Sequence, residues 1–211
     1  MISTWSIACP MILVVDTSIF YHDLENVIDR IDVSLSPDDL DSANGNIGDG
    51  ERYGLRASAS IRLGMLNLPN VLASSRFTVQ DSRVRDPILG TDRSMRFNNR
   101  GRIELGFRHD IPRWNMNYGL NWNNTFDGQR IFYDLEDIEL NAGDPFVFGF
   151  VEYVTDNGLT FRLEGRDLTV NKFCRERQRF VGPISSGIIE EIEDFCSSSG
   201  RVFAIKINWT F

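Results

Sequence analysis

Three cysteines and two histidines are the residues of this chain with the widest possible chemistry. Cys9, Cys174 and Cys196 could ligate a metal, form a disulfide or act as nucleophiles, whereas His22 and His109 could ligate a metal or transfer protons. A structural zinc site needs ligands paired a few residues apart, and the sequence has neither a C-x-x-C pair nor a Cys/His cluster. We therefore interpret both histidines as solvated or hydrogen-bonded, and we expect no metal and no cofactor.

The acidic residues offer equally little chemistry. The segment Ser34–Glu51 is rich in Asp and Asn, but no register places Gly sixth and Glu twelfth as a calcium loop requires, so we interpret it as a solvated surface loop. Nucleophile elbows, phosphate-binding loops, dinucleotide fingerprints and metalloprotease helices are all absent from the sequence. The acidic pairs Asp38/Asp39 and Glu190/Glu191 suggest no acid/base geometry. We expect this protein not to be an enzyme.

The elements that position these residues are predicted to be strands, and the last one is the clearest. Residues 201–211 alternate between an apolar and a mostly polar face, with the period of two that a strand requires. The apolar face carries Phe203, Ile205, Ile207, Trp209 and Phe211. Aromatic residues lie at both ends of this face and isoleucines in its middle, as in a strand that crosses a membrane between two interfaces.

The same alternation recurs along the chain. It is clear in residues 52–63, 102–108, 114–123 and 159–166, and weaker near residues 11–22, 71–82 and 146–155. The intervening connections are alternately short (64–70, 110–113, 156–158) and long and polar (34–50, 83–98, 127–145, 170–200). Strict alternation places all short turns at one end of an up-and-down sheet. The sequence therefore predicts an all-β fold, an antiparallel up-and-down transmembrane β-barrel segment of about eight strands.

Composition narrows the class of protein further. With 42% hydrophobic residues the chain is too apolar for a disordered tail, and a net charge of −8 argues against binding to nucleic acid. The longest apolar run, Ile7–Val15, is interrupted by Pro10, which makes it too short for a spanning helix and a poor export signal. A surface barrel needs export, so we expect the true N-terminus to lie upstream. We separate residues 1–10, an atypical stretch, from residues 11–211.

Three segments resemble the C-terminal barrel of TonB-dependent outer-membrane receptors. NIGDGERYGLRASASIRL (46–63) resembles a downward strand after a long outside loop, and LTFRLEGRDLT (159–169) resembles the penultimate strand. GRVFAIKINWTF (200–211) resembles the terminal strand, whose aromatic end is the signal for the barrel-assembly machinery. The penultimate strand departs from the family pattern at Asp167, where the family commonly has Asn before Leu.

This resemblance implies a location and a set of partners. Members of the family lie in the bacterial outer membrane, contact its lipid, and take up iron chelates, cobalamin, sugars or peptides through a 22-stranded barrel. An N-terminal plug fills that barrel, and a segment before the plug contacts the TonB energy-transducing complex. Neither is recognisable in this sequence, so contact with TonB would require the missing plug region. The sequence does not specify the small ligand.

Two further expectations concern named side chains. Arg162, Glu164, Arg166 and Lys206 fall on the polar faces of the last two strands, where they either contact a ligand or, as we favour, pair with one another in the lumen. The hairpin relation of these strands brings the bases of their long connection together, which predicts a Cys174–Cys196 disulfide outside the cell. Three free thiols are the alternative.

Two other functions fit the same alternation. A complete eight-stranded membrane barrel with a structural or adhesion role would need no further strands. A soluble barrel or sandwich that binds a small molecule is also two-faced, with its apolar side inward. The aromatic ends of the last strand argue against the soluble form.

Overall fold

The computed structural model describes residues 3–8, 13–36, 39–96, 99–126 and 130–209. Strands account for 71% of the described residues, and every strand pair among them is antiparallel. Across these five ranges the helical segments are three short 3-10 turns. The prediction of an all-β antiparallel fold is therefore confirmed.

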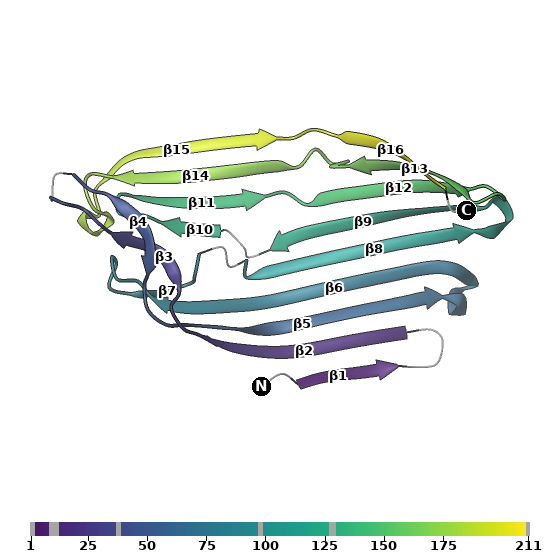
Figure 1. The fold of residues 1–211 in the computed structure, drawn as a ribbon, viewed down its shortest axis with the longest axis horizontal. Coiled ribbons are helices and arrows are strands. Elements are labelled where there is room, and N and C mark those ends of the chain that lie inside the picture. Colours follow the sequence, from purple (N-terminus) through teal and green to yellow (C-terminus); the bar gives the residue numbers. More distant parts are fainter. Residues whose placement is uncertain (1–2, 9–12, 37–38, 97–98, 127–129, 210–211) are drawn as a thin grey trace.

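One long sheet forms most of the molecule (Figure 1). Its strand order follows the chain, which makes it an up-and-down meander with β1 at one edge and β16 at the other. The strands along this path are β1 (Ser3–Ala8), β2 (Leu13–Leu24), β5 (Gly50–Leu63), β6 (Leu68–Arg85), β8 (Gly101–Ile111), β9 (Met116–Phe126), β12 (Phe146–Val154), β13 (Leu159–Arg166) and β16 (Val202–Trp209), while β7 (Asp92–Arg93) pairs with β6. The sheet is open: no pairing joins β1 to β16 in the described ranges. We refer to it as the main sheet.

The prediction of about eight strands is wrong, because the described residues form sixteen. The long connections, which the sequence suggested to be irregular, contain most of the additional strands. A second sheet has the order β10 (Arg130–Tyr133), β11 (Asp137–Gly143), β14 (Lys172–Phe180) and β15 (Ile189–Ser198), and a hairpin joins β3 (Ile28–Asp32) to β4 (Ser42–Asn46). A strand such as KFCRERQRF is polar on both faces, so it lacks the apolar alternation that identifies a half-buried strand.

Short turns and long connections lie at opposite ends of the main sheet (Figure 1). Two of the short turns are 3-10 segments, Gly64–Leu66 and Pro112–Trp114, and each is closed by an asparagine in the left-handed conformation, Asn67 and Asn115. Trp114, expected on the apolar face of a strand, therefore lies in a turn, because Pro112 begins the 3-10 segment there.

Asp167, where the sequence departs from the family pattern, ends β13. Its φ is 53°, a left-handed conformation that Asp and Asn tolerate better than other side chains. Its carboxylate accepts hydrogen bonds from the backbone N–H of Asn171 at 2.6 Å and from the Ser199 hydroxyl at 3.0 Å. A short oxygen-bearing side chain at this position therefore fixes the crossing from the main sheet to the second sheet.

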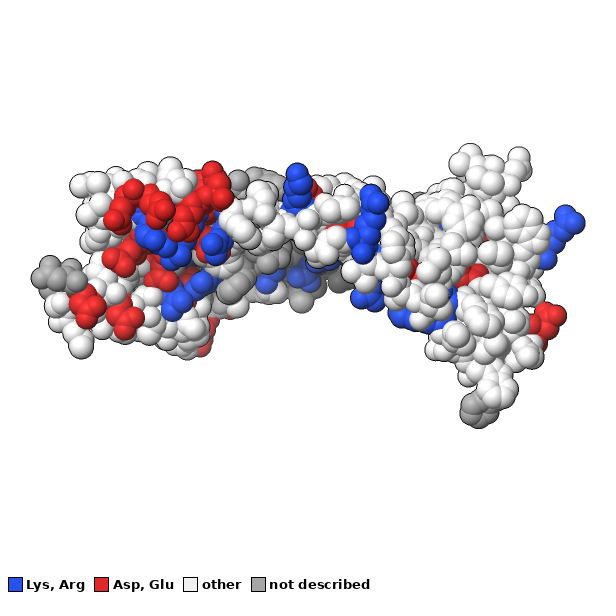
Figure 2. Space-filling view, turned by 90° about the horizontal axis from the view of Figure 1, so that it is seen from above, with Lys and Arg blue, Asp and Glu red and all other residues white. Residues whose placement is uncertain are grey.

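The main sheet is a single layer, and most of its apolar side chains have no protein cover. The buried apolar residues of the described ranges are few: Phe20, Ile47, Val71, Val84, Leu135, Phe180 and Ile184. On β16, by contrast, Phe203, Ile205, Ile207 and Trp209 are 61–75% exposed. Figure 2 shows acidic side chains gathered at the end that carries the long connections, whereas the other end is mostly uncharged.

Register places like side chains on the same side across the whole main sheet. Ile207 pairs with Phe161 of β13, and Val151 of β12 pairs with Tyr118 of β9, so one apolar face runs from strand to strand. The opposite side, called the polar face below, carries Arg162, Glu164 and Lys206. Phe211, expected at the end of the apolar row, lies outside the described residues.

Candidate functional site on the polar face

The four charged residues expected to meet on the polar face do so around Glu164. Its carboxylate accepts hydrogen bonds from Arg162 Nε and Lys206 Nζ, both at 2.8 Å, and Arg166 Nη2 lies 3.5 Å away. Glu164 is only 3% exposed, so its charge is compensated almost entirely by these cations. Arg162 also pairs with Glu152 of β12 at 3.2 Å. The arrangement fits the pairing role that we favoured for these residues.

Two aromatic rings lie over glycines on this same face. Phe150 of β12 covers Gly119 of β9, where an added Cβ would come within 2.6 Å of the ring. The guanidinium of Arg162 lies over the same ring, 3.9 Å from its centroid. Phe20 and Gly54 form a similar pair on β2 and β5, with Arg56 4.5 Å from the ring centroid. Glycine is needed at both positions because a side chain there would displace the ring.

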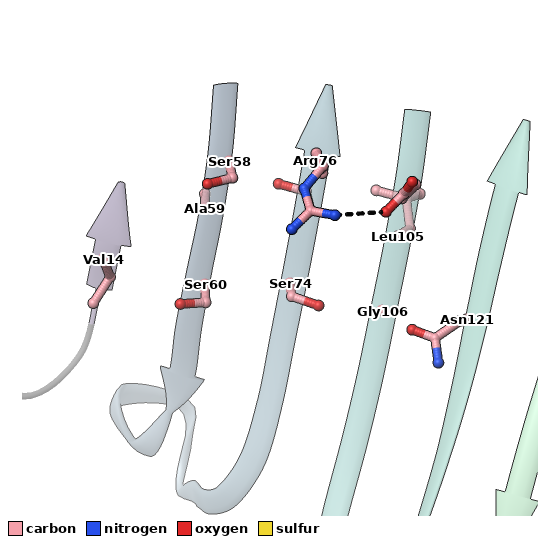
Figure 3. A pocket seen from close by; sticks show the side chains of 11 residues that line it. Val14, Ser58, Ala59, Ser60, Ser74, Arg76, Leu105, Gly106 and Asn121 are labelled. Atoms are coloured by element: carbon pink, nitrogen blue, oxygen red, sulfur yellow. Dashed lines mark hydrogen bonds and ion pairs between the residues drawn. The ribbon is translucent and has the colours of Figure 1, made fainter. Parts of the chain in front are cut away.

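A shallow hollow lies between these two aromatic pairs, on strands β2, β5, β6, β8 and β9 (Figure 3). Its volume is about 280 Å³, and its floor consists of small or neutral polar side chains: Ser58, Ser60, Ser74, Gly106 and Asn121. The Arg76–Glu104 ion pair, 3.3 Å long, forms its wall, and Arg102 holds the second oxygen of Glu104 at 2.8 Å. Serine catalysis needs a free base within hydrogen-bond reach, and the one carboxylate of this lining is engaged by two arginines. The hollow is suited to hydrogen bonding of a ligand.

The long connections are joined by a buried ion cluster. Arg93 is 6% exposed at its side chain and contacts two buried carboxylates, Asp29 of β3 at 2.9 Å and Asp86, which follows β6. Asp86 also accepts hydrogen bonds from the backbone N–H groups of Ile88 and Leu89, at 2.7 and 2.8 Å. The cluster therefore attaches the β3–β4 hairpin to the connection between β6 and β8.

A second, exposed ion pair lies beside this cluster. Asp92 of β7 accepts hydrogen bonds from Arg83, and Arg85 lies 3.4 Å from its other oxygen. These bonds to the ionised form lower the pKa of Asp92 below its ordinary value of 3.8, Arg83 being the larger cause. The carboxylate of Asp32, the last residue of β3, accepts hydrogen bonds from the hydroxyl and the backbone N–H of Ser34. These bonds lower the pKa of Asp32 in the same way.

The second sheet contains a disulfide between Cys174 of β14 and Cys196 of β15, the pair expected from the sequence. These residues lie directly opposite one another in the strand register rather than at the bases of an irregular loop. Arg177 of β14 donates hydrogen bonds to Asp137 of β11, and these bonds raise the pKa of Arg177. The bridge and the ion pair join three of the four strands of this sheet.

Sequence reasoning missed the aromatic–glycine pairs and the ion cluster. The glycines could have been noticed as Gly54 and Gly119 inside strand patterns, since a glycine in a strand often marks a close approach. The pairing of Arg93 with Asp29 had no signal, because Asp29 is 64 residues away along the chain.

Two further observations concern metal binding and membrane-spanning helices. Within the described ranges, no group of three or more His, Cys, Asp or Glu side chains is placed to hold a metal ion. The same ranges contain no helix long and apolar enough to cross a membrane.

Comparison with known proteins gives no relative from which to transfer a function. No protein-family model, no curated protein and no solved structure matches this chain. A functional assignment therefore depends on the geometry described above.

Proposed function

We propose that this chain is the C-terminal part of a bacterial outer-membrane β-barrel, a receptor of the TonB-dependent kind that takes up a scarce small ligand. The exposed apolar face of the main sheet is the observation that carries the proposal. A sheet one layer thick with Ile205 75% exposed and Leu163 49% exposed needs an apolar solvent on that side. Lipid supplies that solvent, and the antiparallel ladder satisfies the backbone hydrogen bonds of the strands between the two edges of the sheet.

Strand length and polarity support the same conclusion. The 18 residues of β6, at about 3.3 Å each and a tilt of about 40°, rise about 45 Å, which exceeds the apolar band of about 25 Å in such barrels. The strands would therefore cross the membrane and continue outside it. The short turns then lie on the periplasmic side, and the second sheet with its disulfide lies outside the cell, where disulfides persist.

The open sheet supports a segment of a wide barrel over a complete eight-stranded one. Strands β1 and β16 lie at opposite edges of the sheet rather than side by side (Figure 1). In this proposal β16 is also the strand that the barrel-assembly machinery recognises. Contact with the TonB complex falls to a plug region outside these residues, and the polar face lines the path of the ligand.

Site-directed labelling in intact cells tests this orientation. Ser186, in the connection between β14 and β15, and Asn157, in a short turn, are each replaced by cysteine in a background where Cys9 is serine. A membrane-impermeant maleimide should label Ser186→Cys in intact cells, and Asn157→Cys only after the outer membrane is permeabilised. Recovery of the protein in a soluble fraction, or labelling of both positions in intact cells, would contradict the proposal.

A further inference from the structure

Strands β9 and β12 place carboxamides beside aromatic rings on the polar face. On this face β9 carries Asn117, Gly119, Asn121 and Asn123, and β12 carries Phe146, Phe148, Phe150 and Glu152. The register pairs Asn123 with Phe146 and Asn121 with Phe148. Phe150 packs over Gly119, whereas Phe146 and Phe148 have no such partner among the described glycines, although apolar rings favour the other face. We call these two rows the amide–aromatic lane.

The lane ends in a cavity where the main sheet meets the second sheet. This cavity has a volume of about 190 Å³, and Asn123, Thr125, Asn141, Asn171, Phe146 and Phe173 contribute to its lining. Asn141 and Phe173 belong to strands of the second sheet and Asn171 to the connection before β14, so the cavity lies toward the end that carries the long connections. In the proposed orientation, a ligand from outside the cell would reach the cavity first and the lane afterwards.

Buried acceptors without partners lie at both ends of the lane. Asn141, 7% exposed, donates a hydrogen bond to Glu139 Oε1 at 2.6 Å, but its own Oδ1 is buried and accepts none. Asn117, 8% exposed, likewise donates to Glu152 Oε1 at 2.9 Å while its Oδ1 accepts no hydrogen bond. A buried carbonyl oxygen without a donor is costly, so each position favours a molecule that brings hydroxyl or N–H donors.

The chemistry of the cavity excludes some classes of ligand. A carboxamide offers a donor and an acceptor side by side, which matches the adjacent hydroxyls of a sugar, and ring faces accept the C–H surface of a sugar ring. Asp144 is the one charged residue in the described lining, which disfavours an anion. The volume is below the range of about 300–1,000 Å³ found for drug-sized ligands, which suits a single sugar unit.

We propose that the cavity and the amide–aromatic lane bind a neutral saccharide, the cavity holding one sugar unit and the lane the units that follow. From Asn117 to Asn123 the lane spans six residue steps, or about 20 Å at the rise of a strand. This inference rests on the proposed function, because the polar face lines a water-filled path for a ligand only if the opposite face contacts lipid.

The test uses the full 211-residue chain in phosphatidylcholine vesicles, where protease protection of the strands reports insertion. Saturation-transfer NMR measures binding of neutral hexasaccharides of glucose, xylose, mannose or N-acetylglucosamine, with citrate as an anionic comparison. At least one neutral hexasaccharide should bind, and irradiation of aromatic protons should saturate its ring C–H protons. Citrate should not bind.

Two variants locate the site. Asn141→Leu keeps the approximate volume of the side chain but removes the orphan acceptor, and it should weaken binding at least tenfold. Asn208→Leu makes the same change on the polar face of β16, away from the lane, and should leave affinity within twofold of the unchanged protein. Both variants must remain protease-protected for the comparison to apply.

The outcomes separate this inference from the proposed function. A protected chain that binds no neutral hexasaccharide, or that binds citrate instead, overturns the saccharide inference and leaves the membrane barrel standing. Equal affinities for Asn141→Leu and Asn208→Leu overturn the assignment of the site. A chain that stays soluble and unprotected contradicts the proposed function, and the saccharide inference with it.

Discussion

Cys174 and Cys196 face one another across β14 and β15, with their Cα atoms 4.1 Å apart and a disulfide between them. The bridge closes a segment in which the two cysteines are 22 residues apart in sequence. A bridge of this kind restricts the unfolded chain, so its effect on stability extends beyond the two residues that it joins.

Removal of this bridge is expected to lower the free energy of unfolding by about 2–4 kcal/mol. The double variant Cys174→Ala with Cys196→Ala makes the change, and urea unfolding from lipid vesicles under oxidising conditions measures it. Peptide mapping without reductant provides an independent check on protein taken from membranes. Alkylation of both cysteines before any reduction would show that the bridge is absent, and would remove the argument for an exterior second sheet.

Substitution within β16 should distinguish the two faces of the main sheet. Ile207→Arg places a charge toward the middle of the lipid and should cost about 2–4 kcal/mol, whereas Asn208→Arg on the polar face should be much milder. The two positions are adjacent, so strand propensity and chain position are matched. Refolding from urea into vesicles measures both, and equal costs would refute the assignment of the faces.

The buried ion cluster predicts a large effect for one arginine. Arg93→Met leaves the carboxylates of Asp29 and Asp86 buried without their main partner, and should cost about 3–5 kcal/mol. Because the cluster joins two connections, hydrogen exchange should accelerate in residues 28–46 and 86–96 together. Arg76→Met removes an exposed pair and should cost about 1 kcal/mol or less. Similar effects of the two changes would mean that the cluster contributes no more than a surface pair.

Asp92 predicts a local dependence on pH. Its pKa in the folded state lies below the ordinary value of 3.8, so its bonds to Arg83 stabilise the fold above that pH. This contribution is lost as the pH falls through the lowered pKa of the folded state. Carboxyl-carbon NMR titration should give a midpoint below 3.8 for Asp92, and Arg83→Gln should move the midpoint upward. An unchanged midpoint in that variant would exclude Arg83 as the cause.

Sequence alone predicted the part of the fold that has two unlike faces. Residues 159–166 were expected as a strand and form β13 with the same bounds, because Leu, Phe and Leu alternate there with Thr, Arg and Glu. Residues 172–180 were expected as loop and form β14, because Arg, Glu and Gln occupy both faces of that strand. Alternation identifies a strand only where its two sides meet different solvents.

The candidate site was predictable only to the extent that its residues belong to neighbouring strands. Glu164 and Lys206 lie on consecutive strands of the main sheet, and their alternation places both on one face. Asn141 belongs to the second sheet, and its place beside Asn123 and Phe146 of the main sheet depends on how the two sheets meet. No local pattern in the sequence encodes that junction.

The ion cluster around Arg93 also limits how the exterior of this protein can be changed. Because Asp29 and Asp86 come from different connections and share one arginine, neither connection keeps its buried charges balanced when the other is exchanged. Grafting a single one of these connections from another protein onto this chain would therefore disturb the second connection that was left intact. Chimeras should retain function only when both connections, residues 25–49 and 86–100, are transferred as one unit.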